Sequence, residues 1–159
     1  MGQDSRLPFF RTEQVSNIAA GADWSIVAPG RGYWLLLSVY AKLVTSAVVA
    51  NRQAQFTVDD QSTTYFKVPL GAAIAASSTV EYCGFAGAQA SAIAGGTVVF
   101  PLPPTGLLLP PGARFRITTA LIDAGDQWSN VAASIQEFPV SGNSQFYPGA
   151  YTTYNEESA

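Results

Sequence analysis

The chain has 159 residues, of which 48% are hydrophobic and only 12% carry a charge, about half of the ~25% found in ordinary soluble domains. Its eight basic residues are scattered and its formal net charge is −3, which argues against the concentrated basic face that nucleic-acid binding needs. No run approaches the ~18 apolar residues of a membrane span, and the N-terminus lacks the apolar block of a signal peptide. A surface so poor in charge predicts that copies of the chain or another protein cover part of it.

The first part of the chain predicts an arm followed by a hairpin. Residues 1–12, MGQDSRLPFFRT, are expected to form an extended arm that docks Phe9 and Phe10 on the domain itself or on a neighbouring subunit. The next two short runs, EQVSNIAA and DWSIVA, are separated by Gly-Ala and have the composition of strands. We expect them to pair as a first hairpin.

The most apolar run, YWLLLSVYAKLV at residues 33–44, is predicted to form a strand. Its odd-numbered positions are all apolar and its even-numbered positions are mixed, so a period of two predicts that the odd-numbered face is buried. We expect packing to be the role of Trp34, which lies inside this run. Residues 51–58 alternate before DDQS ends the run, and we expect the two runs to form a long hairpin.

The middle and the end of the chain predict further strands and loops. Residues 71–96 are rich in Ala, Gly and Ser and predict long surface loops around a strand at 79–85. The prolines that follow favour extended chain with one short strand. Phe115, Ile117, Thr119 and Leu121 form one apolar alternation and Val131, Ala133 and Ile135 form another, so we expect two antiparallel strands joined by the loop DAGDQWSN.

Together these runs predict an all-β protein. No window shows helical periodicity, and eight or more short strands between turns are typical of an antiparallel β-sandwich of jelly-roll type. We expect this domain at residues 13–139, with extended N- and C-terminal arms at 1–12 and 140–159.

The sequence offers little for catalysis. It contains no histidine, which excludes Ser-His-Asp and Cys-His arrangements and histidine metal sites. The remaining carboxylate pairs, Asp59-Asp60 and Asp123 with Asp126, lie in sequences typical of turns, and we favour that interpretation over calcium binding or acid–base chemistry. Cys83, between apolar neighbours, is expected to be a buried thiol. We therefore expect no enzyme activity, no cofactor and no metal.

Trp128 follows a polar loop and begins the last expected strand. Simple alternation places it on the face opposite Val131 and Ile135, which makes it either a lid on the end of the barrel or a contact residue at an interface. Both interpretations stay open. The three tryptophans of the chain also allow a stacking platform for sugars, as in sandwich-shaped carbohydrate-binding modules.

One family resemblance rests on the overall pattern rather than on a motif. The long apolar strand leading to ANRQAQFTVDD, the proline-rich crossing into LLLPPGARFRITTALIDAGDQWSNVAASIQEF and the aromatic-rich tail resemble the capsid decoration, or cement, proteins of tailed bacteriophages. The resemblance covers about residues 13–138. It implies a structural virion protein that is made in the host cytoplasm, forms a homotrimer and binds the major capsid protein on the outer capsid surface.

No residue can be carried over from that family by motif, so the expected contact residues are chosen as aromatic anchors in arms and loops. They are Phe9, Phe10, Trp128, Phe146, Tyr147, Tyr151 and Tyr154. The alternatives are a carbohydrate-binding receptor module and another β-type head or tail subunit of a phage. A carboxylate-dependent hydrolase is the least favoured hypothesis.

Overall fold

The computed structural model describes residues 7–93 and 96–139, and every regular element in these ranges is a β-strand. The prediction of an all-β protein is confirmed. The strands are β1 (Phe9–Val15), β2 (Trp24–Val27), β3 (Gly32–Val44), β4 (Gln53–Asp59), β5 (Thr64–Pro69), β6 (Thr79–Ala86), β7 (Ser91–Ile93), β8 (Thr97–Leu102), β9 (Leu107–Leu109), β10 (Arg114–Ala120) and β11 (Gln127–Pro139).

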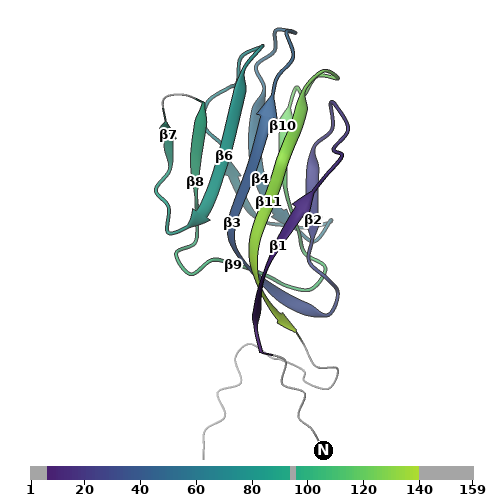
Figure 1. Cartoon of the computed structure of the whole chain (residues 1–159), viewed down its shortest axis with the longest axis vertical. Helices are drawn as coiled ribbons and strands as arrows, with labels where there is room; N and C mark the ends of the chain where they lie inside the picture. Colours follow the sequence, from purple (N-terminus) through teal and green to yellow (C-terminus); the bar gives the residue numbers. More distant parts are fainter. Residues whose placement is uncertain (1–6, 94–95, 140–159) are drawn as a thin grey trace, which may run out of the picture.

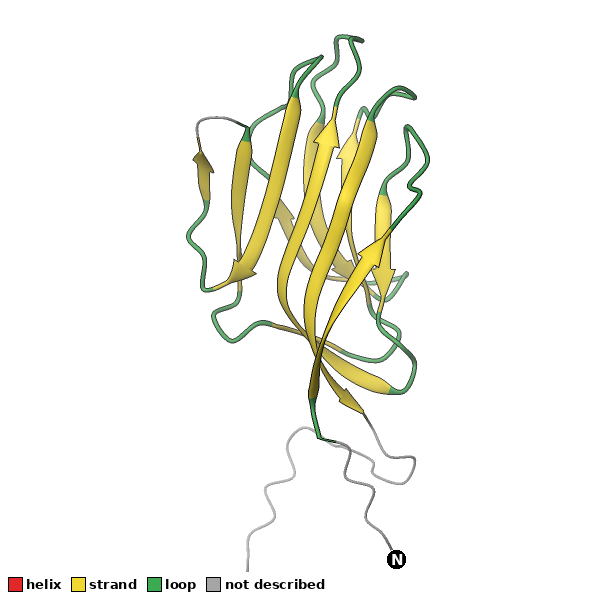
Figure 2. Ribbon diagram, in the orientation of Figure 1, coloured by secondary structure: helices red, strands yellow, loops and turns green. Residues whose placement is uncertain are grey.

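The strands form two sheets that pack face to face (Figure 1). One sheet has the order β1-β11-β3-β6-β8-β7, with β9 beside the lower part of β3, and the other has the order β2-β10-β4-β5. Leaving β7, β8 and β9 aside, the chain changes sheet after every strand except β4, which is the winding of a jelly roll. The predicted jelly-roll sandwich is confirmed. One pair departs from the antiparallel rule, because β8 runs parallel to β6 (Figure 2).

The three predicted hairpins are wrong. In each case the two strands lie in opposite sheets: β1 and β2, β3 and β4, and β10 and β11. The partners of β3 are β11, β6 and β9, whereas β4 pairs with β10 and β5. The reason is that alternation reports only that a strand has one buried face. Two strands that face each other across a core show the same pattern as two neighbours in one sheet.

A bulge divides the buried face of β3. Pairing with β11 shifts register at Ser134 and Ile135, which lie opposite Ser38 and Leu36, so that Leu37 is an extra residue. Beyond it the odd-numbered Val39, Ala41 and Leu43 are buried, as predicted, but before it the even-numbered Trp34 and Leu36 are buried instead. The predicted packing role of Trp34 is confirmed, since only 3% of its surface is exposed.

Aromatic side chains fill the space between the sheets. Phe56 of β4 lies 5.3 Å from Phe100 of β8 and 6.4 Å from Phe115 of β10 between ring centroids, distances typical of attractive ring pairs. Gly84 of β6 leaves the room that the Phe100 ring needs, because a Cβ at this position would lie 2.2 Å from Phe100 Cζ. The core therefore depends on an absent side chain as well as on large ones.

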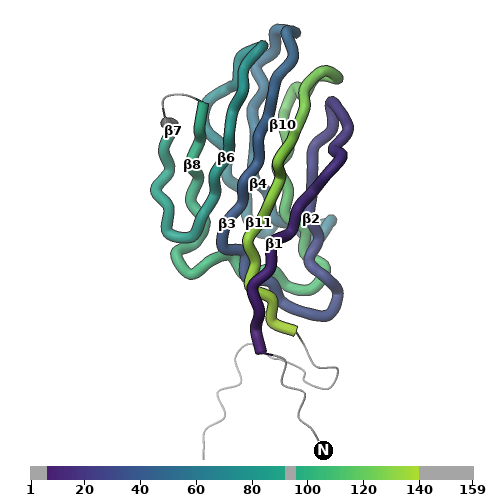
Figure 3. The backbone as a smooth tube through the Cα atoms, viewed as in Figure 1, coloured from purple at the N-terminus to yellow at the C-terminus, as the bar shows by residue number. Residues whose placement is uncertain are grey.

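The two ends of the sandwich differ in what they carry. β1 begins and β11 ends side by side at one end, where Phe9 is paired with Glu137 (Figure 3). β1 begins at Phe9, so the last four residues of the arm predicted over 1–12 are part of a strand, while the predicted tail, 140–159, lies outside the described residues. The opposite end is named the loop end. It comprises residues 16–23, 45–52, 70–78 and 121–126.

Candidate functional site

A buried ion pair holds two loops of the loop end together. Arg52 and Asp126 have no exposed side-chain surface, and Arg52 Nε donates to Asp126 Oδ2 at 2.5 Å. The carboxylate also accepts the backbone N–H groups of Ser46 and Asp123, each at 2.8 Å. Arg52 donates in turn to the Val48 carbonyl oxygen and to Ser46 Oγ, each at 3.0 Å. Because nearly every polar atom of the pair is satisfied, the loops 45–52 and 121–126 form one rigid unit.

This network uses the carboxylates that were candidates for catalysis. Burial alone would raise the pKa of the Asp126 carboxyl, but the hydrogen bond from Arg52 and those from two backbone N–H groups hold the pKa below its ordinary value. Asp123 accepts hydrogen bonds from the Gly125 N–H and the Ser46 hydroxyl. The predicted turn interpretation of Asp123 and Asp126 is confirmed.

The second carboxylate pair is also structural. Asp60 accepts the N–H groups of Ser62 and Thr63, which closes the turn between β4 and β5. Asp59 is almost fully buried, accepts from Arg114 Nε at 2.9 Å and lies 3.0 Å from Arg116 Nε. Burial would raise the Asp59 pKa, but the Gln61 N–H and the Arg114 guanidinium lower it on balance. Both aspartates therefore have structural partners.

The rigid loops present apolar side chains to solvent. Val48 is 53% exposed, Val49 is 91% exposed and Leu121 is 67% exposed. Leu121 also has a φ of 57°, a left-handed conformation that is rare for residues other than glycine and asparagine. We call these three side chains the apolar rim. All three side chains belong to the two loops that the Arg52–Asp126 pair joins, and the chain itself leaves each of them uncovered.

Trp128 does not provide a contact surface. It is 1% exposed and packs against Tyr82 at 5.6 Å and Trp24 at 6.4 Å between ring centroids. A bulge explains the difference from the prediction: the register with β3 shifts between Ser129 and Ala132, and Asn130 has a φ of 52°. The extra residue brings Trp128 onto the same face as Val131, inside the core. Its burial fits the interpretation of Trp128 as a lid on the core. The interpretation of Trp128 as a contact residue is wrong, because its side chain has almost no exposed surface.

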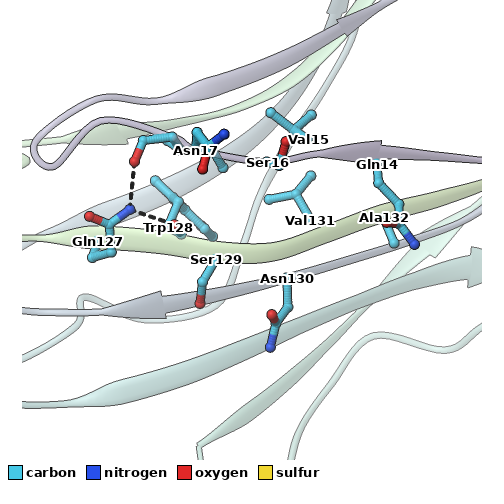
Figure 4. Close-up of a pocket in the computed structure, with 11 residues that line it drawn as sticks. Gln14, Val15, Ser16, Asn17, Gln127, Trp128, Ser129, Asn130, Val131 and Ala132 are labelled. Atoms are coloured by element: carbon cyan, nitrogen blue, oxygen red, sulfur yellow. Dashed lines mark hydrogen bonds between the residues drawn. The ribbon is translucent and has the colours of Figure 1, made fainter.

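An uncharged groove with both polar and apolar lining residues lies where β1 separates from β11, as Figure 4 shows. Its volume is about 540 Å³. Gln127 closes one end by donating from Nε2 to the Ile18 carbonyl oxygen at 2.8 Å. The residues that line it are all uncharged: Gln14, Val15, Ser16, Asn17, Ile18, Gln127, Trp128, Ser129, Asn130, Val131 and Ala132. Such amides and hydroxyls can hydrogen-bond a neutral polar ligand, and nothing in the sequence pointed to them because the groove depends on the β11 bulge and on strand pairing.

The other expected contact residues fall in two groups. Phe9 and Phe10 lie in β1, 45% and 73% exposed respectively, so both retain free apolar surface. Phe146, Tyr147, Tyr151 and Tyr154 lie outside the described residues. Among the three expected residues that the structure describes, Phe9 and Phe10 lie at the start of β1, whereas Trp128 lies in the core near the loop end.

Other chemical groups in the described ranges are dispersed. Within residues 7–93 and 96–139 no three histidine, cysteine, aspartate or glutamate side chains gather closely enough to hold a metal ion. Cys83 is half-buried rather than fully buried, and burial raises the pKa of its thiol, which leaves it a poor nucleophile. Nothing in the same ranges forms a helix of the length and apolarity that a bilayer crossing requires.

Comparison with known proteins adds little. No family model and no curated protein matches the chain. Among solved structures, a chain in the crystal structure of the T13 IBDV viral particle is similar with 14% sequence identity and a TM-score of 0.30. The alignment covers 87% of this chain and 36% of that one. A likeness at this level carries no argument about function, which has to come from the surface described above.

Proposed function

We propose that the protein is a structural subunit that binds other proteins, specifically a decoration protein that stabilises a phage capsid from its outer surface. The observation that carries the proposal is the apolar rim on its rigid support. Val48, Val49 and Leu121 are exposed, whereas Arg52 and Asp126 of the same two loops are buried and hydrogen-bonded to each other, and Arg52 also donates to the Val48 carbonyl oxygen. A preorganised apolar surface loses little conformational entropy on binding, so more of the contact energy contributes to affinity.

The proposed stabilisation of the capsid follows from mass action. A protein that binds only the assembled shell lowers the free energy of that state, and many weak contacts on one particle add up. The rim supplies the contact with the major capsid protein, and the exposed Phe9 and Phe10 supply contacts between subunits. The phage setting and the homotrimer come from the resemblance in sequence pattern, and they are part of the proposal.

The test is co-sedimentation of the purified protein with empty heads assembled from the major capsid protein of the same phage. The expected result is saturable binding that falls at least tenfold in Val49→Asp, because a charge in an apolar contact must be desolvated. The matched control is Val27→Asp, which alters a half-exposed valine of β2 away from the loop end and leaves binding unchanged. Absence of wild-type binding overturns the capsid proposal, and equal losses in both variants overturn the role of the rim.

The alternative function, a carbohydrate-binding receptor module, is favoured by one observation, the uncharged groove of Figure 4, whose lining includes amide and hydroxyl side chains. A stacking role for Trp128 is ruled out by its burial, so sugar would have to bind through hydrogen bonds from the groove. Binding of the wild-type protein on a glycan array, lost in Asn17→Ala, would favour this alternative over the capsid proposal.

A further inference from the structure

The outer edge of β1 is an unpaired strand edge. β1 is the first strand of its sheet and pairs with β11 on one side only (Figure 1). Among the described residues no strand pairs with its other side, and most of its residues are exposed. Its seven residues, FFRTEQV, contain no proline, and no register shift interrupts the pairing with β11. A regular edge of this kind is a template for another strand.

The sequence of β1 is complementary to itself. If two copies pair antiparallel with Thr12 opposite Thr12, then Arg11 of each copy lies opposite Glu13 of the other, and Phe9 lies opposite Val15. Opposite charges, paired threonines and aromatic–aliphatic pairs each stabilise neighbouring strands when they lie directly opposite each other. We propose that the β1 edge joins two copies of this chain about a two-fold axis at Thr12, making one continuous sheet.

The charges also select the register. A shift of the two-fold axis to Arg11 places two guanidinium groups opposite each other, and a shift to Glu13 places two carboxylates opposite each other. Like charges in these positions are destabilising. Within one chain Arg11 already lies beside Glu13 and donates to Glu137 Oε2 at 2.7 Å. With the axis at Thr12, the two copies of Arg11 and Glu13 form an alternating square of four charges.

The pairing is isologous, so it joins chains in twos and does not itself build a trimer. A three-fold assembly would have to use another surface. The inference is independent of the proposed capsid binding, because self-association is measured on the purified protein without heads.

Cysteine cross-linking tests the register directly. Cys83→Ala removes the single native thiol, and Phe10→Cys, Thr12→Cys or Gln14→Cys is then added one at a time. Opposed residues in antiparallel strands have Cα atoms about 4.5–5.5 Å apart, within the range of a disulfide. Only Thr12→Cys should form disulfide-linked dimers in a glutathione redox buffer, because the other two positions are displaced from their own mates by four residues, about 14 Å. A mixture of Phe10→Cys and Gln14→Cys should cross-link. No cross-link at position 12, or equal cross-linking at all three positions, overturns the proposal.

A charge-exchange experiment separates pairing from folding. With Thr12→Cys and Cys83→Ala present, Arg11→Glu gives a chain with two acidic residues in these positions, and Glu13→Arg gives a chain with two basic ones. Each should cross-link at least tenfold less than its parent, whereas an equimolar mixture should recover heterodimers. Circular dichroism verifies that both variants fold, and if either does not, the position scan decides alone. Failure of two folded variants to recover on mixing overturns the charge pairing.

Discussion

The replacement Asp126→Asn should destabilise the protein strongly. Asparagine has the size of aspartate and can still accept the Ser46 N–H, but it leaves the Arg52 guanidinium fully buried without its anion. Removal of one partner from a buried ion pair costs about 3–5 kcal/mol. A domain has a free energy of unfolding of about 5–15 kcal/mol, so this one change should remove a large fraction of it.

Urea unfolding followed by tryptophan fluorescence measures this loss, since Trp24, Trp34 and Trp128 are all buried. The control Asp123→Asn affects a carboxylate that accepts hydrogen bonds from the Ser46 hydroxyl and the Gly125 N–H near the surface, and should cost much less stability than Asp126→Asn. Replacing both partners, as in Arg52→Met with Asp126→Leu, should restore only part of the stability, because it removes the unpaired charge but leaves the Ser46 and Asp123 N–H groups without their acceptor. A loss below about 1 kcal/mol in Asp126→Asn would refute the assignment of the pair as the support of the loop end.

Three further results are expected. Asp59 and Asp126 have folded-state pKa values below the ordinary 3.8. The stability that these two carboxylates contribute is therefore present above pH 3.8 and is lost as the pH falls through their folded-state pKa values. Urea unfolding of the wild-type protein and of Asp126→Asn at a series of pH values from 7 to 2 measures this loss. Gly84→Ala should lower the free energy of unfolding by about 1–3 kcal/mol, because the added Cβ would overlap the Phe100 ring. Gly30→Ala is the control: an added Cβ there has no atom within 4 Å, so the melting temperature should change little. Asn130→Val should be about 1 kcal/mol less stable than Asn130→Gly in the same assay, because Asn130 is left-handed; equal stabilities would contradict this.

The strands could be predicted from the sequence better than their partners. A period of two revealed the buried face of β10 through Phe115 and Ile117 and that of β11 through Val131 and Ile135. It could not reveal that β10 and β11 lie in different sheets, because pairing depends on the path of the loop DAGDQWSN. Leu121 illustrates the limit: it continues the apolar alternation, yet its left-handed backbone turns it to solvent.

The candidate surfaces were less predictable still. Trp128 was assigned to the wrong face because one extra residue in a strand inverts the alternation, and no local composition marks a bulge with Asn130 at its centre. The Arg52–Asp126 pair joins positions 74 residues apart, and sequence alone offers no reason to connect them. The turns at Asp60 and Asp123 were predictable, since aspartate there bonds to its own backbone.

The central position of β11 bears on the synthesis of this protein. β11 is the last strand of the described chain, yet it lies in the sheet between β1, which is the first strand of the chain, and the long strand β3. On the ribosome, β1 has no partner strand until β11 emerges, and β3 keeps one edge open for the same period. At about 5–20 residues per second, the nascent chain therefore leaves β1 and one edge of β3 unpaired for several seconds, and β11 fills the space between them only after Pro139 has been added.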